Sequence, residues 1–204
     1  MQASNSHRVR RALSCLALLT TFGCGAGAPA YPYAREPDPR RSEYVIGVAD
    51  SLRVRVWRYA ELNTEVQVRP DGTITLPLVG DVAAAQHTPS ELKREITNRL
   101  VAFIKTDESM VAVEVAQINS YTVTVTGNVT RPGIMESSRY LSVGEAITLA
   151  GGPNPFANAD QAMIIRTRKS GKVVHIPIRY DLIMQGKARD QDIMLLRGDL
   201  VHVP

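Results

Sequence analysis

The segment that most constrains the fold runs from Val66 to Val82 and contains two turn signals. Its sequence, VQVRPDGTITLPLVGDV, alternates apolar and polar residues on both sides of Pro70-Asp71-Gly72. Such alternation is typical of half-buried strands, and a Pro-Asp-Gly sequence reverses the chain. We therefore expect a hairpin of two short strands around that turn, closed by a second turn at Gly80-Asp81. The segment contains neither a nucleophile nor a cluster of metal ligands, so it predicts architecture rather than chemistry.

The size and charge of the chain exclude some classes of function. With 204 residues, 44% of them hydrophobic, it is large enough for one large or two small domains with real cores. The formal net charge is +4, but Arg8, Arg10 and Arg11 lie in the first 23 residues, which contain no acidic residue. The remaining chain is nearly neutral, and the full sequence has only three Phe and one Trp. Nucleic-acid binding is therefore not indicated.

Residues 1–23 predict a secretory signal peptide. A basic stretch, His7–Arg11, precedes the apolar run Ala12–Phe22, which is much shorter than the roughly 20 residues that span a bilayer. The sequence Thr21-Phe22-Gly23-Cys24 resembles the lipobox of bacterial lipoproteins, although Thr21 replaces the usual aliphatic residue. We expect acylation of Cys24, with plain cleavage at the small residues that follow as the alternative. Residues 24–42 are rich in Pro, Gly and Ala and predict a lipid-anchored tether.

The first folded unit is expected over residues 43–117. Leu52–Trp57 alternates like a strand, and the predicted hairpin follows it. Thr88-Pro89-Ser90-Glu91 is a capping box that predicts the start of a helix, and Met110–Val115 predicts a final strand. The order β-β-β-α-β indicates a small α+β module. The expected helix carries a one-sided apolar stripe formed by Leu92, Ile96, Leu100 and Ile104.

The second folded unit is expected over residues 118–204. Tyr121–Thr126 predicts a strand, and the capping box Ser142–Glu145 predicts a short helix that ends at a Gly-Gly-Pro sequence. A hairpin is expected around Ser170-Gly171, and Leu200–Val203 predicts the last strand. Two strands, a helix and further strands form a β-grasp order, so the whole chain is predicted to be α+β.

The ordered set of motifs resembles the Wza-type outer-membrane polysaccharide export (OPX) family. The resemblance implies that residues 43–117 are a polysaccharide export domain and residues 118–204 one soluble-ligand-binding β-grasp (SLBB) domain. Ala49 replaces a usual Gly, Gln86-His87 replaces a Gly before Thr88, and the chain stops after one β-grasp domain. The motifs that carry the resemblance are Gly47–Asp50, Leu52–Val56, Pro70–Ile74, Leu76–Gly80, Thr88–Leu92, Val125–Val129, Arg131–Gly133, Ala146-Ile147, Ala150–Gly152 and Gly198–Pro204.

The resemblance implies a component of a capsule or exopolysaccharide export channel. The expected form is a homo-oligomeric ring, anchored through Cys24 on the periplasmic side of the outer membrane of a Gram-negative bacterium, that conducts the polysaccharide chain. Since the sequence continues into no amphipathic helix, we expect a short member that needs a separate outer-membrane β-barrel protein. An inner-membrane polysaccharide co-polymerase is the second implied partner. The alternative is a monomeric carbohydrate- or small-ligand-binding sensor lipoprotein, and a glycan hydrolase is a third hypothesis.

The sequence predicts no catalytic, cofactor-binding or metal-binding residue, and therefore no enzyme. The four His residues show no ligand spacing, and there is no nucleophile-elbow, phosphate-loop or zinc-protease motif. For several residues the alternative to a structural role is a contact to a glycan or a place in a carboxylate pair, and the structural role is favoured for each. These residues are Arg53, Arg55, Arg69, Trp57, Tyr121, Tyr140, Asp50, Asp71, Asp81 and Asp199.

Overall fold

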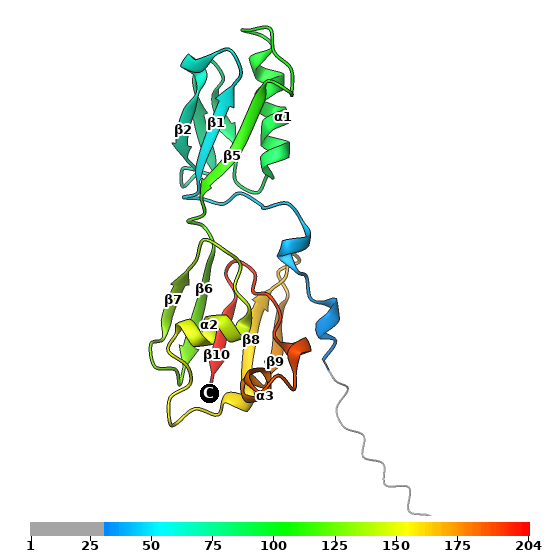
Figure 1. Ribbon diagram of the computed structural model, residues 1–204, viewed down its shortest axis with the longest axis vertical. Helices are drawn as coiled ribbons and strands as arrows, with labels where there is room; N and C mark the ends of the chain where they lie inside the picture. Colours follow the sequence, from blue (N-terminus) through cyan, green and yellow to red (C-terminus); the bar gives the residue numbers. More distant parts are fainter. Residues whose placement is uncertain (1–30) are drawn as a thin grey trace, which may run out of the picture. The chain divides into compact units, whose positions relative to one another are not determined.

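The computed structural model describes residues 31–204 (Figure 1). The expected signal peptide, residues 1–23, and Cys24 lie outside the described residues. Two separate hydrophobic cores form in the described chain, one between Ile46 and Val111 and the other between Tyr121 and Val203. Both cores lie between strands and helices, so the predicted α+β class is confirmed.

The first module combines a three-stranded antiparallel sheet, a two-stranded hairpin and one helix. The sheet has the order β2-β1-β5, and β3 pairs only with β4. The elements are β1 (Ser51–Val56), a 3-10 turn η3 (Ala60–Leu62), β2 (Thr64–Gln67), β3 (Thr73–Leu76), β4 (Gly80–Ala83), α1 (Pro89–Leu100) and β5 (Val111–Gln117).

The hairpin expected around Pro70-Asp71-Gly72 is wrong, because the strands on either side of this turn belong to different sheets. The chain after β2 is held to the segment before β1, since the Ala49 N–H donates to the Val68 carbonyl and the Val68 N–H to the Asp50 carbonyl, both at 2.9 Å. The strand β3 instead pairs with β4, which begins at Gly80, where the sequence predicts a closing turn. The order of the module is thus β-β-β-β-α-β, with one strand more than expected.

The helix α1 begins and packs as its sequence predicts. The Thr88 side chain accepts a hydrogen bond from the Glu91 N–H, and the Glu91 carboxylate accepts one from the Thr88 N–H at 2.8 Å. Leu92, Ile96 and Leu100 are buried, whereas Ile104, expected on the same stripe, lies beyond the end of α1 and is partly buried against the core. The capping box therefore fixes the start of the helix, and the apolar stripe fixes the face that packs on the core.

The second module is a mixed five-stranded sheet with helices on one face. Its order is β7-β6-β10-β8-β9, in which only β6 and β10 run parallel. This is the β-grasp arrangement that the element order predicts, including the hairpin between β8 and β9. The elements are β6 (Thr122–Gly127), β7 (Gly133–Glu136), α2 (Val143–Leu149), η4 (Ala159–Gln161), β8 (Ala162–Thr167), β9 (Val173–Ile178), α3 (Tyr180–Met184), η5 (Arg189–Gln191) and β10 (Leu200–Val203).

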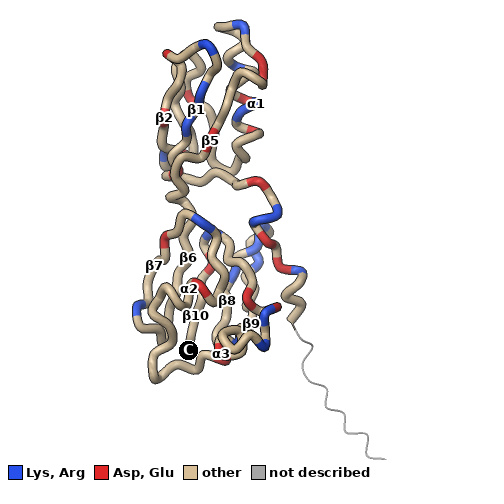
Figure 2. The backbone as a smooth tube through the Cα atoms, viewed as in Figure 1, with Lys and Arg blue, Asp and Glu red and all other residues tan. Residues whose placement is uncertain are grey.

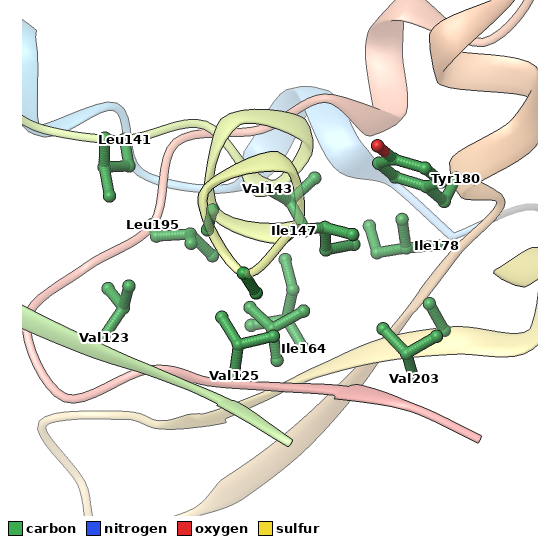
Figure 3. Packing of buried hydrophobic residues seen from close by; sticks show 14 of the residues in the cluster. Val123, Val125, Leu141, Val143, Ile147, Ile164, Ile178, Tyr180, Leu195 and Val203 are labelled. Atoms are coloured by element: carbon green, nitrogen blue, oxygen red, sulfur yellow. The ribbon is translucent and has the colours of Figure 1, made fainter. Parts of the chain in front are cut away.

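The short helix α2 closes the core of the second module. Its N-terminus carries the predicted capping box of Ser142 and Glu145. Figure 3 shows Val143 and Ile147 of α2 above the strands that carry Val125 and Ile164. Because these side chains are fully buried, each contributes roughly 1.5–3 kcal/mol of transfer free energy.

The residues Tyr31–Arg41, which we call the strap, pack against the second module. They form two 3-10 turns, η1 (Tyr33–Arg35) and η2 (Pro39–Arg41). The Tyr33 hydroxyl donates to the Pro177 carbonyl of β9 at 2.6 Å, and both Tyr31 and Tyr33 contact the core. The expected tether, residues 24–42, therefore includes a stretch with long-range contacts that its composition does not reveal.

Replacing Ala49 or Gln86 by Gly should stabilise the first module by about 0.5–1 kcal/mol each. Ala49 has φ +72° and Gln86 φ +67°, in the left-handed region that a Cβ disfavours. The resemblance described above implies a glycine at position 49 and another at Gln86-His87. Thermal and urea unfolding measure the gain, and Gly80→Ala at φ +73° should give a loss of similar size. Unchanged stability in both glycine variants would show that the left-handed backbone carries no strain here.

Candidate functional site

The histidines offer no metal site in the part of the chain that the structure describes. No three His, Cys, Asp or Glu side chains gather there to hold an ion. His87 contacts the Ala85 carbonyl, and His202 contacts the Thr126 hydroxyl at 3.2 Å, on different modules. His175 lies on β9, whereas His7 is outside the described residues. His87 and His202 therefore have local structural contacts.

Asp50 is the polar centre of the junction between the two modules. Its side chain is fully buried directly before β1. One carboxylate oxygen accepts from the Gly47 N–H at 2.8 Å and from the Tyr44 hydroxyl at 2.7 Å. The other accepts from the N–H groups of Asn119 and Ser120 at 2.9 and 2.8 Å. Burial opposes the charged form, but these donors outweigh it and hold the pKa of Asp50 below its ordinary value.

Arg197 and Tyr44 complete this junction. The Arg197 guanidinium donates to the Val45 carbonyl at 2.8 Å and lies over the Tyr44 ring, 5.8 Å from its centroid. Burial and the Asp50 carboxylate raise the pKa of Tyr44 to about 12, so its hydroxyl remains a donor at neutral pH. A Cβ on Gly47 would lie 2.3 Å from both Arg197 and Ser120. Only glycine fits there, which explains one element of the Gly47–Asp50 motif.

A second buried polar cluster joins the strap to the second module. Arg166 on β8 is 1% exposed, and its Nε donates to the Asp199 carboxylate at 3.0 Å. Its Nη1 donates to Glu36 of the strap at 2.8 Å, and its Nη2 donates to the Met194 carbonyl at 3.0 Å. Three charged side chains from distant parts of the sequence thus share one buried, fully hydrogen-bonded site.

Glu36 is the residue that fixes the strap. Its side chain is 4% exposed, and its carboxylate accepts from Arg166, Arg168 and the Tyr31 hydroxyl. Burial acts to raise the pKa of Glu36, but the hydrogen bonds from Arg168 and Tyr31 and the two positive charges lower it below the ordinary value. The carboxylate is therefore ionised when the strap is in place.

Replacing Glu36 by Gln should release the strap and raise its cleavage by trypsin about tenfold. The neutral glutamine loses the charge-assisted hydrogen bonds from the two arginines. If the free energy that binds the strap to the second module falls by about 1.4 kcal/mol, the population of molecules with a detached strap rises tenfold. Arg35, Arg40 and Arg41 provide the cleavage sites. Mass spectrometry follows the cut. Glu43→Gln is the matched control, because Glu43 contacts Ser90 of the first module. Equal cleavage rates in wild type and Glu36→Gln would show that Glu36 does not hold the strap.

The three arginines named above as alternative glycan contacts fall into two groups. Arg53 is paired with Glu65 at 2.9 Å, and Arg69 with Asp71 and Asp81. Arg55, on the same face of β1 as Arg53, has no carboxylate within 4 Å among the described residues. Figure 2 shows basic and acidic residues interspersed through both modules. Pairing thus explains Arg53 and Arg69 but not Arg55.

The tyrosines and the remaining aspartates have structural contacts. Tyr121 is 2% exposed, accepts from the Leu141 N–H, and packs edge-on against Tyr140. Asp71 accepts from the Thr73 N–H within its turn. Asp199 also caps a turn, but its ion pair with Arg166 was not foreseen. The one sequence signal for this ion pair is Arg166 itself, a charged residue at a position that the alternation of β8 predicts to be buried.

No helix within residues 31–204 has the length and apolar character to cross a bilayer.

The comparisons with known proteins match most of the described chain. Residues 38–116 match the family described as polysaccharide biosynthesis/export protein, and residues 122–177 match the SLBB domain. The chain is 34% identical over 156 residues to the exopolysaccharide production protein ExoF of Rhizobium meliloti, covering 70% of this chain and 34% of that protein.

Two further relatives transport or export other polysaccharides. The polysialic acid transport protein KpsD of Escherichia coli is 28% identical over 146 residues, covering 71% of this chain and 25% of the relative. The capsule polysaccharide export outer membrane protein CtrA of Neisseria meningitidis is 30% identical over 139 residues, covering 67% and 33%. The chain thus spans about a quarter to a third of the length of these relatives.

Proposed function

Because this chain belongs to the outer-membrane polysaccharide export family, we propose that it is a component of a channel that exports a capsular or exocellular polysaccharide. The observation that carries this proposal is the occurrence, in one chain and in this order, of a polysaccharide export domain and an SLBB domain. The relatives named for exopolysaccharide production, polysialic acid transport and capsule export support the same class of cargo.

The proposed mechanism is enclosure of the polymer rather than chemistry on it. Copies of the two-module unit pack side by side in a closed cyclic ring, whose lumen gives the polysaccharide a hydrated path. The wall of such a conduit makes weak polar contacts, because tight binding would stall the chain. The buried polar clusters at Asp50 and Arg166 support a structural role of this kind, because their hydrogen bonds join the strands, the strap and the two modules.

The proposed location is the periplasmic side of the outer membrane. Acyl chains on Cys24, repeated around the ring, would hold the assembly to the membrane by avidity. We place the boundary between the export domain and the SLBB domain near residue 118. An inner-membrane polysaccharide co-polymerase and an outer-membrane pore protein are the proposed partners.

Deletion of the gene, together with the native mass of the protein, tests this proposal. The deletion strain should lose surface polysaccharide while its synthesis enzymes remain active, and the detergent-solubilised mature protein should be a multimer with an acylated N-terminal Cys. Normal surface polysaccharide in the deletion strain would refute the export function. A monomer that binds a glycan tightly would instead indicate a carbohydrate-sensing lipoprotein, and a monomer that binds none would refute the ring.

A further inference from the structure

The outer face of β1 presents an aligned row of polar and aromatic side chains. Leu52, Val54 and Val56 point into the core, so the alternate residues Arg53, Arg55 and Trp57 lie on the opposite face. Trp57, directly after the strand, is 69% exposed. A tryptophan this exposed contributes little to the hydrophobic core. The stability of the fold therefore does not explain why a large aromatic residue stands at this position.

A groove runs beside this row, between the end of β1 and the start of β5, and its backbone is held firmly. The Trp57 N–H donates to the Met110 carbonyl at 2.7 Å, and the Asn63 side chain accepts from the Val56 N–H at 2.7 Å. Arg58 follows in the left-handed region at φ +67°. The polar and aromatic residues that line the groove are Arg55, Trp57, Arg58, Asn63, Ser109 and Glu114.

The charge in the groove is positive after internal pairing is considered. The negative charge of Glu114 is partly offset by Arg53, which lies 3.9 Å away, outside the groove. Arg53 also pairs with Glu65. Neither Arg55 nor Arg58 has a carboxylate within 4 Å in residues 31–204. Two guanidinium groups beside an exposed indole therefore have no anionic partner in the described chain.

We propose that this groove binds a carboxylate-bearing pyranose of an acidic polysaccharide. The flat indole of Trp57 would stack on the apolar face of the sugar ring, and Arg55 and Arg58 would bind the sugar carboxylate by charge-assisted hydrogen bonds. This inference rests on the proposed export function and assigns its polymer to the acidic class. The charge of the groove and the single aromatic platform favour a glycan over a protein partner, whose interface would have an apolar core.

Trp57 allows a direct test, because it is the single tryptophan of the chain. The full mature protein is titrated with hexagalacturonate while the tryptophan emission is recorded, and with cellohexaose as the neutral probe. We expect a saturable change with hexagalacturonate, at least tenfold weaker binding of cellohexaose, and weaker binding at high salt. The double variant Arg55→Gln, Arg58→Gln should lose about tenfold in affinity. The control Arg69→Gln, at an exposed arginine in the turn between β2 and β3, should retain wild-type affinity.

Three results would overturn the inference. The first is no emission change with hexagalacturonate, the second is equal binding of both sugars, and the third is wild-type affinity in the double variant. Saturable binding of a glutamate hexapeptide, with no binding of hexagalacturonate, would show a protein-docking surface instead. Calorimetry with Trp57→Phe, checked for folding by circular dichroism, should show weakened hexagalacturonate binding. If the deletion strain loses its surface polysaccharide but the groove binds no uronate, this inference fails while the export function remains.

Discussion

Replacing Arg166 by Met should lower the free energy of unfolding by about 3–5 kcal/mol, the largest effect expected in the second module. The guanidinium is 1% exposed and lies between Asp199 and Glu36. Without it, two buried carboxylates lose a charged partner and the Met194 carbonyl loses a donor. The cost arises from these uncompensated groups, because methionine itself packs well at a buried strand position.

The pH dependence distinguishes this cause from a simple loss of packing. The pKa of Glu36 lies below its ordinary value of 4.5 partly because of the Arg166 charge, so wild type loses this stabilising contribution as the pH falls below 4.5. Without Arg166 the pKa of Glu36 is lowered less and the variant loses less, so the deficit of Arg166→Met should narrow below pH 4.5. Urea unfolding at several pH values measures this deficit. The control is Arg179→Gln, which removes an exposed ion pair with Asp160 at 3.8 Å and should cost less than about 1 kcal/mol. A deficit that is independent of pH would show that the charges at this site are not the source of its stability.

Local signals account for the parts of the fold that the sequence predicted. The two capping boxes, at Thr88 and Ser142, need only residues three apart, and strand alternation needs only neighbours. The turn at Ser170-Gly171 joins strands that do pair, so the predicted hairpin is confirmed. These features are decided within a few residues and can be derived without knowledge of the rest of the chain.

Long-range pairing accounts for the parts that the sequence could not predict. The turn at Pro70–Gly72 has a hairpin sequence, yet the backbone of Val68 is bound by the segment before β1, and β3 pairs with β4 instead. Glu36 and Arg166 are 130 residues apart, and no local pattern joins them. The strap therefore looks like a tether in the sequence although it contacts the second module.

The candidate binding groove shows the same division. Alternation along β1 places Arg53, Arg55 and Trp57 on one face, which the sequence predicts. Which arginine is neutralised depends on the register with β2 and β5, because these strands bring Glu65 and Glu114 beside Arg53 and Ala112 beside Arg55. Arg53 and Arg69 are thus in ion pairs, and Arg55 gains a candidate function only from strand register.

Replacing Asp50 by Ala should destabilise the protein by about 3–4 kcal/mol and loosen the junction between the modules. Three backbone N–H groups, those of Gly47, Asn119 and Ser120, would lose their acceptor in a buried site. Tyr44→Phe is the matched control, because it removes one donor and leaves the carboxylate bound to the backbone, at a cost of about 1 kcal/mol.

The pKa of Asp50 fixes the pH range of this effect. Because the folded-state pKa lies below the ordinary value of 3.8, the ionised carboxylate stabilises the fold fully above that value. This contribution is lost as the pH falls through the lower folded-state pKa, so the difference between wild type and Asp50→Ala should be constant from pH 6 to 8 and shrink below pH 3.8. Hydrogen exchange at the Asn119 and Ser120 amides should accelerate in the variant at neutral pH. Unchanged exchange there, with an unchanged unfolding free energy, would show that the junction does not depend on Asp50, and that another contact, such as Arg197 with the Val45 carbonyl, holds the modules together.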